Sequence, residues 1–367
     1  MRLGFIILIA MVAGCTGADA RSGADSAVAW TPAPPAKLAD RLDSARLAVA
    51  FERAADLPRL RSLIVQWRGQ VVGEEYFNGA RPTTRANIKS ASKSIVSALV
   101  GIAIAQGELR GVDQPISELL VAETRGLDSA KRAITVGDLL SMRAGLQSTS
   151  FGNYGAWVTS RNWVRYALQR PMVAPAGDAG PMIYSTGSSH LLSAILTRTS
   201  RVSTWEYANR HLARPLAIAL PQWQRDPQGV YFGGNDMYMT PRAMVAFGNL
   251  YLRRGKTADG KQVVPAAWVD SSWVVRTRSD WSGMEYGYGW WARPMAGHDV
   301  RLAWGYGGQF IFVVPSLDLV VWKLGGRDEQ YAPDNTGLKP SPASKEQVDE
   351  RRGWKETVDK ETAVRRT

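Results

Sequence analysis

Hydrophobic positions divide the chain into two strand-rich ends and a helical middle. Apolar and β-branched residues at 63–67 and 71–77, with a turn at 68–70, predict a β-hairpin. Similar runs return only at 286–291, 310–314 and 317–322, and the Pro-Ser pair at 315–316 predicts a turn between the last two. From about residue 90 to 255 apolar residues recur at helical spacing, as at 191–196 and 244–252.

This order of elements predicts an α+β fold. One antiparallel sheet would be built from both chain ends with flanking helices, and residues 90–255 would form a helical lobe. A chain of 367 residues is long enough for one large domain, which we place at 38–367 with a peripheral tail at 339–367. We expect a site in the cleft between sheet and lobe.

The first residues have the pattern of an export signal. Arg2 precedes an apolar run at 3–14, which is shorter than the roughly 20 residues that span a bilayer. The run ends in V-A-G-C at 12–15, and Cys15 is the only cysteine. This motif resembles the lipobox of bacterial lipoproteins, which implies a signal peptide at 1–14 and lipidation of Cys15. An ordinary signal peptide with an incidental cysteine is the alternative.

The next segment indicates where an anchored protein would reside. Residues 15–37 are rich in Ala, Ser, Gly and Pro, which predicts a flexible tether. Thr16 stands where lipoproteins of the inner membrane commonly carry Asp. We therefore expect a lipid anchor in the bacterial cell envelope, at the outer membrane facing the periplasm, with a Gram-positive surface as the alternative.

Composition excludes several classes of site. A single cysteine rules out an internal disulfide and a metal site of clustered thiolates. The three histidines are widely spaced and no H-E-x-x-H occurs, so we expect no metal and no cofactor. The formal charge of +12 comes without a nucleic-acid-binding motif, and we expect no nucleic-acid partner.

Candidate chemistry begins at the S-x-x-K motif formed by Ser90 and Lys93. The following Ile95, Leu99 and Ile102 have helical spacing. Residues three apart share a helix face, so the Lys93 amine can reach the Ser90 hydroxyl. The helix N-terminus favours a neutral lysine, which completes the requirements for a serine nucleophile activated without histidine. The alternative is an N-capping serine beside an exposed lysine.

Further segments follow in a familiar order: I-T-V-G-D-L-L-S-M-R-A-G-L at 134–146, Y-S-T-G at 184–187, D-P-Q-G at 226–229 with G-G-N at 233–235, and Y-G-G-Q at 306–309. With Ser90 and Lys93 they resemble the serine β-lactamase and penicillin-binding-protein superfamily across about 63–322. The likeness is greatest to class C β-lactamase-like serine hydrolases, which include esterases and 6-aminohexanoate-dimer hydrolases. It implies a β-lactamase/transpeptidase-like fold.

The family's second motif, Y-x-N or Y-x-S, is assigned to Tyr184. It precedes a helix start and lies after the nucleophile, as the family order requires. Tyr76 also begins a Y-x-N but lies before Ser90, and Tyr207 lies inside a helix-like run, where packing is the better explanation. Thr186 stands where Asn is commoner, and its hydroxyl would still support the site through a hydrogen bond.

The third motif departs from the K-T-G of β-lactamases. Tyr306, Gly307, Gly308 and Gln309 occupy the corresponding strand, without a cation. The glycines permit close approach of a substrate, and the resemblance implies that the Gln309 N–H joins the Ser90 N–H in an oxyanion hole. A Gly-rich bulge at a sheet edge is the structural alternative. The missing lysine disfavours penicillins and D-alanyl peptides.

These motifs predict a serine hydrolase that cleaves a small-molecule ester or amide through an acyl-enzyme on Ser90. Lys93 and Tyr184, its phenol acidified by Lys93, would form the proton relay, with the identity of the base left open. A peptidoglycan-acting DD-peptidase or β-lactamase and a non-catalytic envelope-binding lipoprotein are the alternatives. His190 could act as a base, but we interpret it as a satisfied or exposed helical residue, because a Ser-His-Asp enzyme of the α/β-hydrolase type would carry G-x-S-x-G, which is absent.

Overall fold

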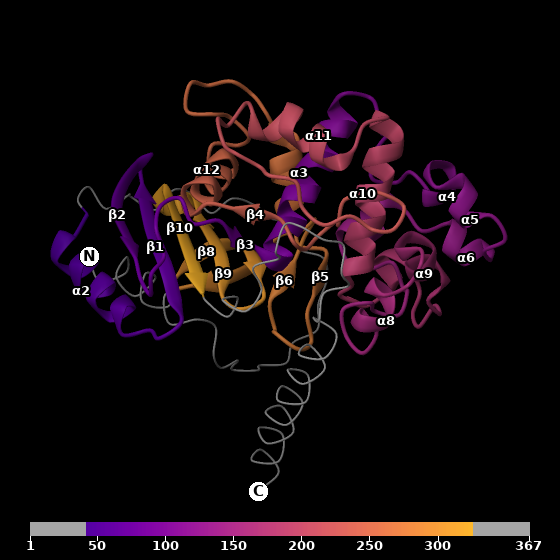
Figure 1. Ribbon diagram of the computed structural model, residues 1–367, viewed down its shortest axis with the longest axis horizontal. Coiled ribbons are helices and arrows are strands. Elements are labelled where there is room, and N and C mark those ends of the chain that lie inside the picture. The colour runs from indigo at the N-terminus through magenta and orange to yellow at the C-terminus, as the bar shows by residue number, and fades with distance from the viewer. Residues whose placement is uncertain (1–41, 326–367) are drawn as a thin grey trace, which may run out of the picture.

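The computed structural model describes residues 42–325. Its main sheet has eight antiparallel strands in the order β2-β1-β10-β9-β8-β7-β6-β5. The hairpin of β1 (Leu60–Trp67) and β2 (Gln70–Tyr76) pairs through β1 with β10 (Leu319–Gly325), so both chain ends build one sheet (Figure 1). The predicted α+β architecture is confirmed.

The far half of the sheet differs from the sequence prediction. Its strands are β5 (Thr277–Arg278), β6 (Glu285–Tyr286), β7 (Trp291–Met295), β8 (His298–Gly305) and β9 (Gln309–Val314). The predicted strand at 286–291 was wrong in its interior, because the backbone turns there: Gly287 N–H donates to Trp290 and Gly289 has φ 76°. A separate short ladder joins β3 (Ala86–Asn87) and β4 (Tyr238–Met239).

Helices cover both faces of the sheet (Figure 1). Helix α2 (Ser44–Ala55) buries Phe51 and Ala54 in a cluster with Leu63 of β1. Helix α12 (Pro241–Leu252) lies against the other face, where a Cβ at Gly248 would come within 2.7 Å of Ile311. That glycine lets the helix backbone approach the sheet closely.

Helix α3 (Ser92–Ala105) runs through the centre of the molecule. Its predicted stripe of Ile95, Leu99 and Ile102 is buried, but so is every other residue from Ser92 to Ala103. Helices α10 (Thr186–Ser200) and α13 (Ala266–Trp273) and strand β8 pack around it. The residue pair at the start of α3 is therefore held by a dense core from several sides.

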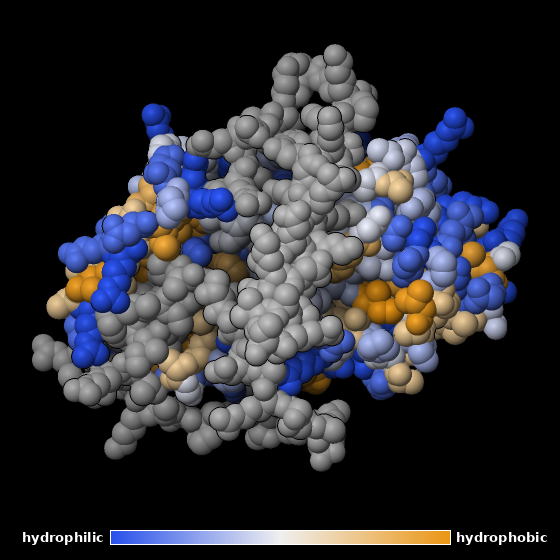
Figure 2. Space-filling view, turned by 90° about the horizontal axis from the view of Figure 1, so that it is seen from below, coloured by the Kyte–Doolittle hydropathy of each residue, from blue (hydrophilic) through white to orange (hydrophobic). Residues whose placement is uncertain are grey.

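The helical lobe lies at the right of Figure 1. Its shorter helices are α4 (Ile116–Leu119), α5 (Val121–Thr124), α6 (Ser129–Arg132), α7 (Val136–Leu140), α8 (Tyr154–Val158), α9 (Trp163–Gln169) and α11 (Thr204–Ala208). Of the helices within residues 42–325, none is both long and apolar enough to cross a membrane. In the view of Figure 2, hydrophilic residues alternate with separate hydrophobic patches at both ends of the molecule.

Four expectations fall outside the described residues. They are the signal peptide at 1–14, lipidation of Cys15, the tether at 15–37 and the peripheral tail at 339–367. They stay predictions.

Candidate active site

Ser90 lies on a tightly held turn. The 3-10 turn η1 (Lys89–Ala91) leads directly into α3, and Lys89 has φ 50°, which is unusual for a residue other than glycine. The Lys89 N–H donates to Asn87 Oδ1 at 2.9 Å, and the Asn87 amide donates to Asp236 at 2.6 Å. These bonds stabilise the strained conformation that presents Ser90.

Lys93 lies in the first turn of α3, and its amine contacts three oxygen atoms from different parts of the chain. Its Nζ lies 3.0 Å from Ser90 Oγ, 3.2 Å from Thr186 Oγ1 and 2.8 Å from the carbonyl oxygen of Gly234. The side chain is buried and none of these three partners carries a charge. Burial lowers the pKa of Lys93 to about 7, because the ammonium form loses its hydration.

Tyr184 lies two residues before α10 with its ring in an aromatic cluster. The ring stacks on Trp291 at 5.7 Å between centroids, and Lys93 Nζ lies 5.0 Å from its centroid. Burial raises the pKa of the Tyr184 phenol, and a hydrogen bond with Ser90 offsets this only in part. The expected acidified phenol is therefore not found: Tyr184 keeps its proton at neutral pH, while Lys93 is the group shifted towards its neutral form.

Thr186 occupies the place expected for it, and a serine missed by the sequence reading holds it there. The Thr186 N–H donates to Ser150 Oγ at 2.8 Å, and the two hydroxyl oxygens are also 2.8 Å apart. Ser150 lies in a loop without a recognisable motif. Gly234, the other Lys93 partner, lies in the quoted G-G-N segment, although no role was assigned to it.

Tyr306, Gly307 and Gly308 form the turn between β8 and β9, so of the segment expected on a strand only Gln309, the first residue of β9, lies in one. Gly305 pairs with Gln309 across it, and a Cβ at Gly305 would come within 2.2 Å of the Ile88 carbonyl oxygen. The end of β8 thus lies against the residues that lead into Ser90. Gly307 and Gly308 have φ of 84° and 93°, which favour glycine. The oxyanion-hole role of the Gln309 N–H stays a prediction.

The competing tyrosines lie elsewhere. Tyr207 is buried in α11 with its hydroxyl 3.2 Å from Gln106, as expected of a packing residue, and Tyr76 bonds Glu74 on β2. Within residues 42–325, no group of three or more His, Cys, Asp or Glu side chains has the placement of a metal site.

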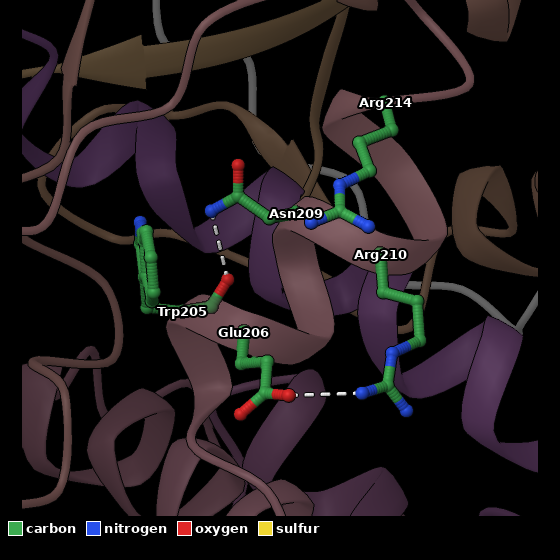
Figure 3. Close-up of a pocket in the computed structure, with 5 residues that line it drawn as sticks. All are labelled: Trp205, Glu206, Asn209, Arg210 and Arg214. Carbon is green, nitrogen blue, oxygen red and sulfur yellow. Dashed lines mark hydrogen bonds and ion pairs between the residues drawn. The ribbon is translucent and has the colours of Figure 1, made fainter.

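A hollow lies beside α11, away from Ser90 (Figure 3). It is lined by Trp205, Glu206, Asn209, Arg210 and Arg214. Three of its polar side chains are already engaged, since Arg210 pairs with Glu206 at 2.9 Å and the Asn209 amide donates to the Trp205 carbonyl at 3.0 Å. It presents no activated nucleophile, and the cluster of Ser90, Lys93, Tyr184 and Thr186 is the candidate active site.

Comparisons with known proteins identify the family of this chain. The beta-lactamase family model matches residues 61–336, about three quarters of the chain. A search among curated proteins found no match.

Solved structures share the fold at low sequence identity. A protein assigned as a 6-aminohexanoate-dimer hydrolase from Bacillus anthracis is 19% identical, with 75% of each chain covered and a TM-score of 0.64. EstCE1, a hydrolase with promiscuous acyltransferase activity, is 18% identical over 75% of this chain and 91% of its own, with a TM-score of 0.61. A class C beta lactamase from Rhodobacter sphaeroides is 17% identical over 77% and 93%, with a TM-score of 0.58. With the S-x-x-K pair at the start of a buried helix, the chain belongs to the beta-lactamase family.

Proposed function

We propose that the protein is a serine hydrolase that cleaves an ester or amide bond through an acyl-enzyme on Ser90. The observation that carries this proposal is the environment of Lys93. A buried lysine with its pKa lowered to about 7 is largely neutral at slightly alkaline pH, and its amine lies 3.0 Å from the Ser90 hydroxyl. A neutral amine in contact with a serine hydroxyl is the arrangement needed to activate the nucleophile.

The hydrogen-bond capacity of Lys93 fits the neutral form. A neutral amine has two N–H donors and one lone pair. In the neutral form the Gly234 carbonyl and the Thr186 hydroxyl oxygen accept the two donors and the lone pair accepts the Ser90 O–H, whereas the ammonium form donates to all three oxygens. The lowered pKa, not these contacts, favours the neutral form. The base is therefore Lys93 in this proposal, and Tyr184 keeps its proton.

The reaction then proceeds by two acyl transfers. Ser90 Oγ bonds to the substrate carbonyl carbon as its proton passes to Lys93, and backbone N–H groups of Ser90 and Gln309 stabilise the oxyanion. The bond to the leaving alcohol or amine breaks as that group takes up a proton through Lys93 and Tyr184. Water then attacks the acyl-enzyme as its proton passes to Lys93. The bond to Ser90 Oγ breaks, Lys93 returns the proton to that oxygen, and the acid is released.

Aromatic side chains indicate the character of the substrate. Phe151 and Trp281 are 49% and 43% exposed, and each lies 6.3 Å from Tyr184 between ring centroids. Since Tyr184 would face the leaving group, these rings favour substrates with an apolar leaving alcohol or amine. The solved neighbours named as a 6-aminohexanoate-dimer hydrolase and as a hydrolase with promiscuous acyltransferase activity support hydrolysis by acyl transfer, without a choice between ester and amide.

For cellular location we propose the bacterial envelope, with a lipid on Cys15 as the anchor. The support is the V-A-G-C motif after a short apolar run and the absence of any other cysteine in the sequence. Thr16 favours the outer membrane facing the periplasm.

A labelling experiment tests the nucleophile. A fluorophosphonate should label the wild-type protein and the Ser97→Ala control. Ser97 lies on α3, and its hydroxyl donates to the Tyr288 carbonyl oxygen rather than to any of the site residues. Ser90→Ala should not be labelled and should lose turnover of short-chain p-nitrophenyl esters. Absence of labelling in the folded wild type would instead favour a non-catalytic binding protein.

The substrate class needs a separate panel. We expect turnover of esters or simple amides, and none of a chromogenic cephalosporin or a D-alanyl peptide, because the strand lacks the K-T-G lysine. Turnover of either of these two compounds would favour the peptidoglycan-acting alternative.

A further inference from the structure

Helix α10 carries a buried histidine for which the proposed reaction has no use. His190 and Asp226 have completely buried side chains, and His190 Nε2 lies 3.0 Å from Asp226 Oδ2. Trp157, Trp163 and Phe232 surround the imidazole with ring centroids at 5.4 to 5.9 Å. An ionisable pair in so apolar a setting is expensive to bury unless its hydrogen bonds are satisfied.

The hydrogen bonds fix the tautomer of His190. Its Nδ1 accepts the Gly233 N–H at 3.3 Å, so this nitrogen carries no proton. Nε2 therefore holds the proton and donates it to Asp226. The other Asp226 oxygen accepts the N–H groups of Gln228 and Val230, each at 2.9 Å, so the carboxylate is held as well.

The Gly233 N–H that His190 accepts belongs to the same turn as the carbonyl group that contacts Lys93. Gly233 is followed by Gly234, whose carbonyl oxygen lies 2.8 Å from Lys93 Nζ. Both glycines are tightly enclosed: a Cβ at Gly233 would lie 2.2 Å from the Ser189 carbonyl oxygen, and one at Gly234 would lie 2.9 Å from Lys93 Cγ. A small displacement of this turn would change the Lys93 contact.

We propose that Asp226 and His190 are positioning residues that hold the Gly233–Gly234 turn, so that the Gly234 carbonyl orients the Lys93 amine towards Ser90. The assignment rests on the proposed role of Lys93 as base. It accounts for a buried Asp and His that touch neither Ser90 nor Lys93, and for two adjacent glycines between α10 and α3.

Two substitutions of His190 separate its hydrogen bond with Gly233 from its hydrogen bond with Asp226. His190→Asn places an amide oxygen near the position of Nδ1, where it can still accept the Gly233 N–H. His190→Gln reaches Asp226 but provides no acceptor at that position. We expect kcat per fluorophosphonate-titrated site to fall at least 10-fold in His190→Gln, with KM within 2-fold, and His190→Asn to keep at least 5-fold more activity than His190→Gln.

The pH dependence distinguishes positioning from general destabilisation. The groups around Nζ are Ser90, Thr186, the Gly234 carbonyl and the Tyr184 ring. A displaced carbonyl stabilises the ammonium form less, so the acid limb of kcat/KM should move to lower pH in His190→Gln. His298→Asn, at a largely buried histidine bonded to Ser316, is the control and should leave the limb unchanged. Equal kcat in the two His190 variants, or an unmoved limb in His190→Gln, would overturn the proposal.

A spectroscopic measurement does not depend on any variant being active. With three histidines in the chain, 15N-histidine NMR of the whole protein can assign each ring. We expect the Nε2–H tautomer at His190, and the Nδ1–H tautomer would overturn the network. If the wild type is not labelled at Ser90, the proposed function fails, whereas labelled wild type with the wrong tautomer rejects only the positioning role.

Discussion

Lys93 shows how burial alone can prepare a base. Burial lowers its pKa to about 7 because the ammonium form is desolvated. The amine is protonated and inactive below that pKa and becomes a base above it. We therefore expect kcat/KM to rise with pH through an inflection near 7 and then level off. A pH profile with a neutral ester, measured on active-site-titrated protein, checks this, and an inflection near the ordinary lysine pKa would contradict it.

The same shift predicts a pH-dependent stability effect of Lys93→Met. Between about pH 7 and 10.5 the unfolded wild type binds one more proton than the folded protein, so wild-type stability rises with pH across this range. The penalty for the buried amine is thus largest at and below pH 7. Lys93→Met removes it, and its free energy of unfolding relative to wild type should be higher at pH 6 than at pH 10 by up to several kcal/mol.

Urea unfolding at the two pH values measures that difference. Lys131→Met, on the surface of α6, is the control for loss of a lysine. The Lys93→Met protein should also have no turnover. A difference from wild type that does not change with pH would show that Lys93 is not a desolvated amine.

At the scale of elements, the sequence predicted those features that are determined by residues close together in the chain. The hairpin of β1 and β2 has a clear alternation and turn, and the S-x-x-K pair lies within one helical turn. Strand β8 was missed because His298, Asp299 and Arg301 interrupt its apolar pattern, although the sheet buries His298 and Arg301. Its neighbours across the sheet, not its own composition, make it a strand.

In the candidate site, too, local motifs were predicted and long-range contacts were not. Ser90, Lys93, Tyr184 and Thr186 were found from motifs. The Lys93 contact to Gly234 and the Ser150 contact to Thr186 were not, because each joins residues far apart in the chain. Such contacts arise only when α3, α10 and their loops pack together.

Gly234→Ala tests this packing at the turn between elements. Gly234 has φ 100° and Gly229 has φ 85°, so alanine is strained at both positions. Only at Gly234 would the new Cβ meet Lys93 and Ser189, since nothing lies within 4 Å of one at Gly229. We expect both variants to lose about 1 kcal/mol or more of stability, and only Gly234→Ala to lose turnover, by 10-fold or more. Thermal melts and kcat per titrated site check this, and equal turnover in both would contradict it.

At the scale of the whole molecule, the family match and the export motif lie in separate parts of the chain. The match covers 61–336, whereas the lipobox-like motif ends at Cys15. Residues 15–37, which we predict to be a tether, lie between that cysteine and the residues that the family match covers. A lipid on Cys15 would therefore keep the catalytic domain near the membrane surface without contributing to its fold or to the site around Ser90.

Cys15→Ala tests this independence of anchor and catalysis. A single cysteine is the only attachment point that a lipobox offers, so we expect the wild type expressed in a Gram-negative host to fractionate with membranes and to incorporate labelled palmitate. The variant should do neither. Both proteins, purified in detergent, should hydrolyse a soluble ester with kcat/KM equal within 2-fold, because Cys15 lies far outside the motifs that form the site. Palmitate incorporation by the variant, or its retention in membranes, would show that another feature of the chain anchors it.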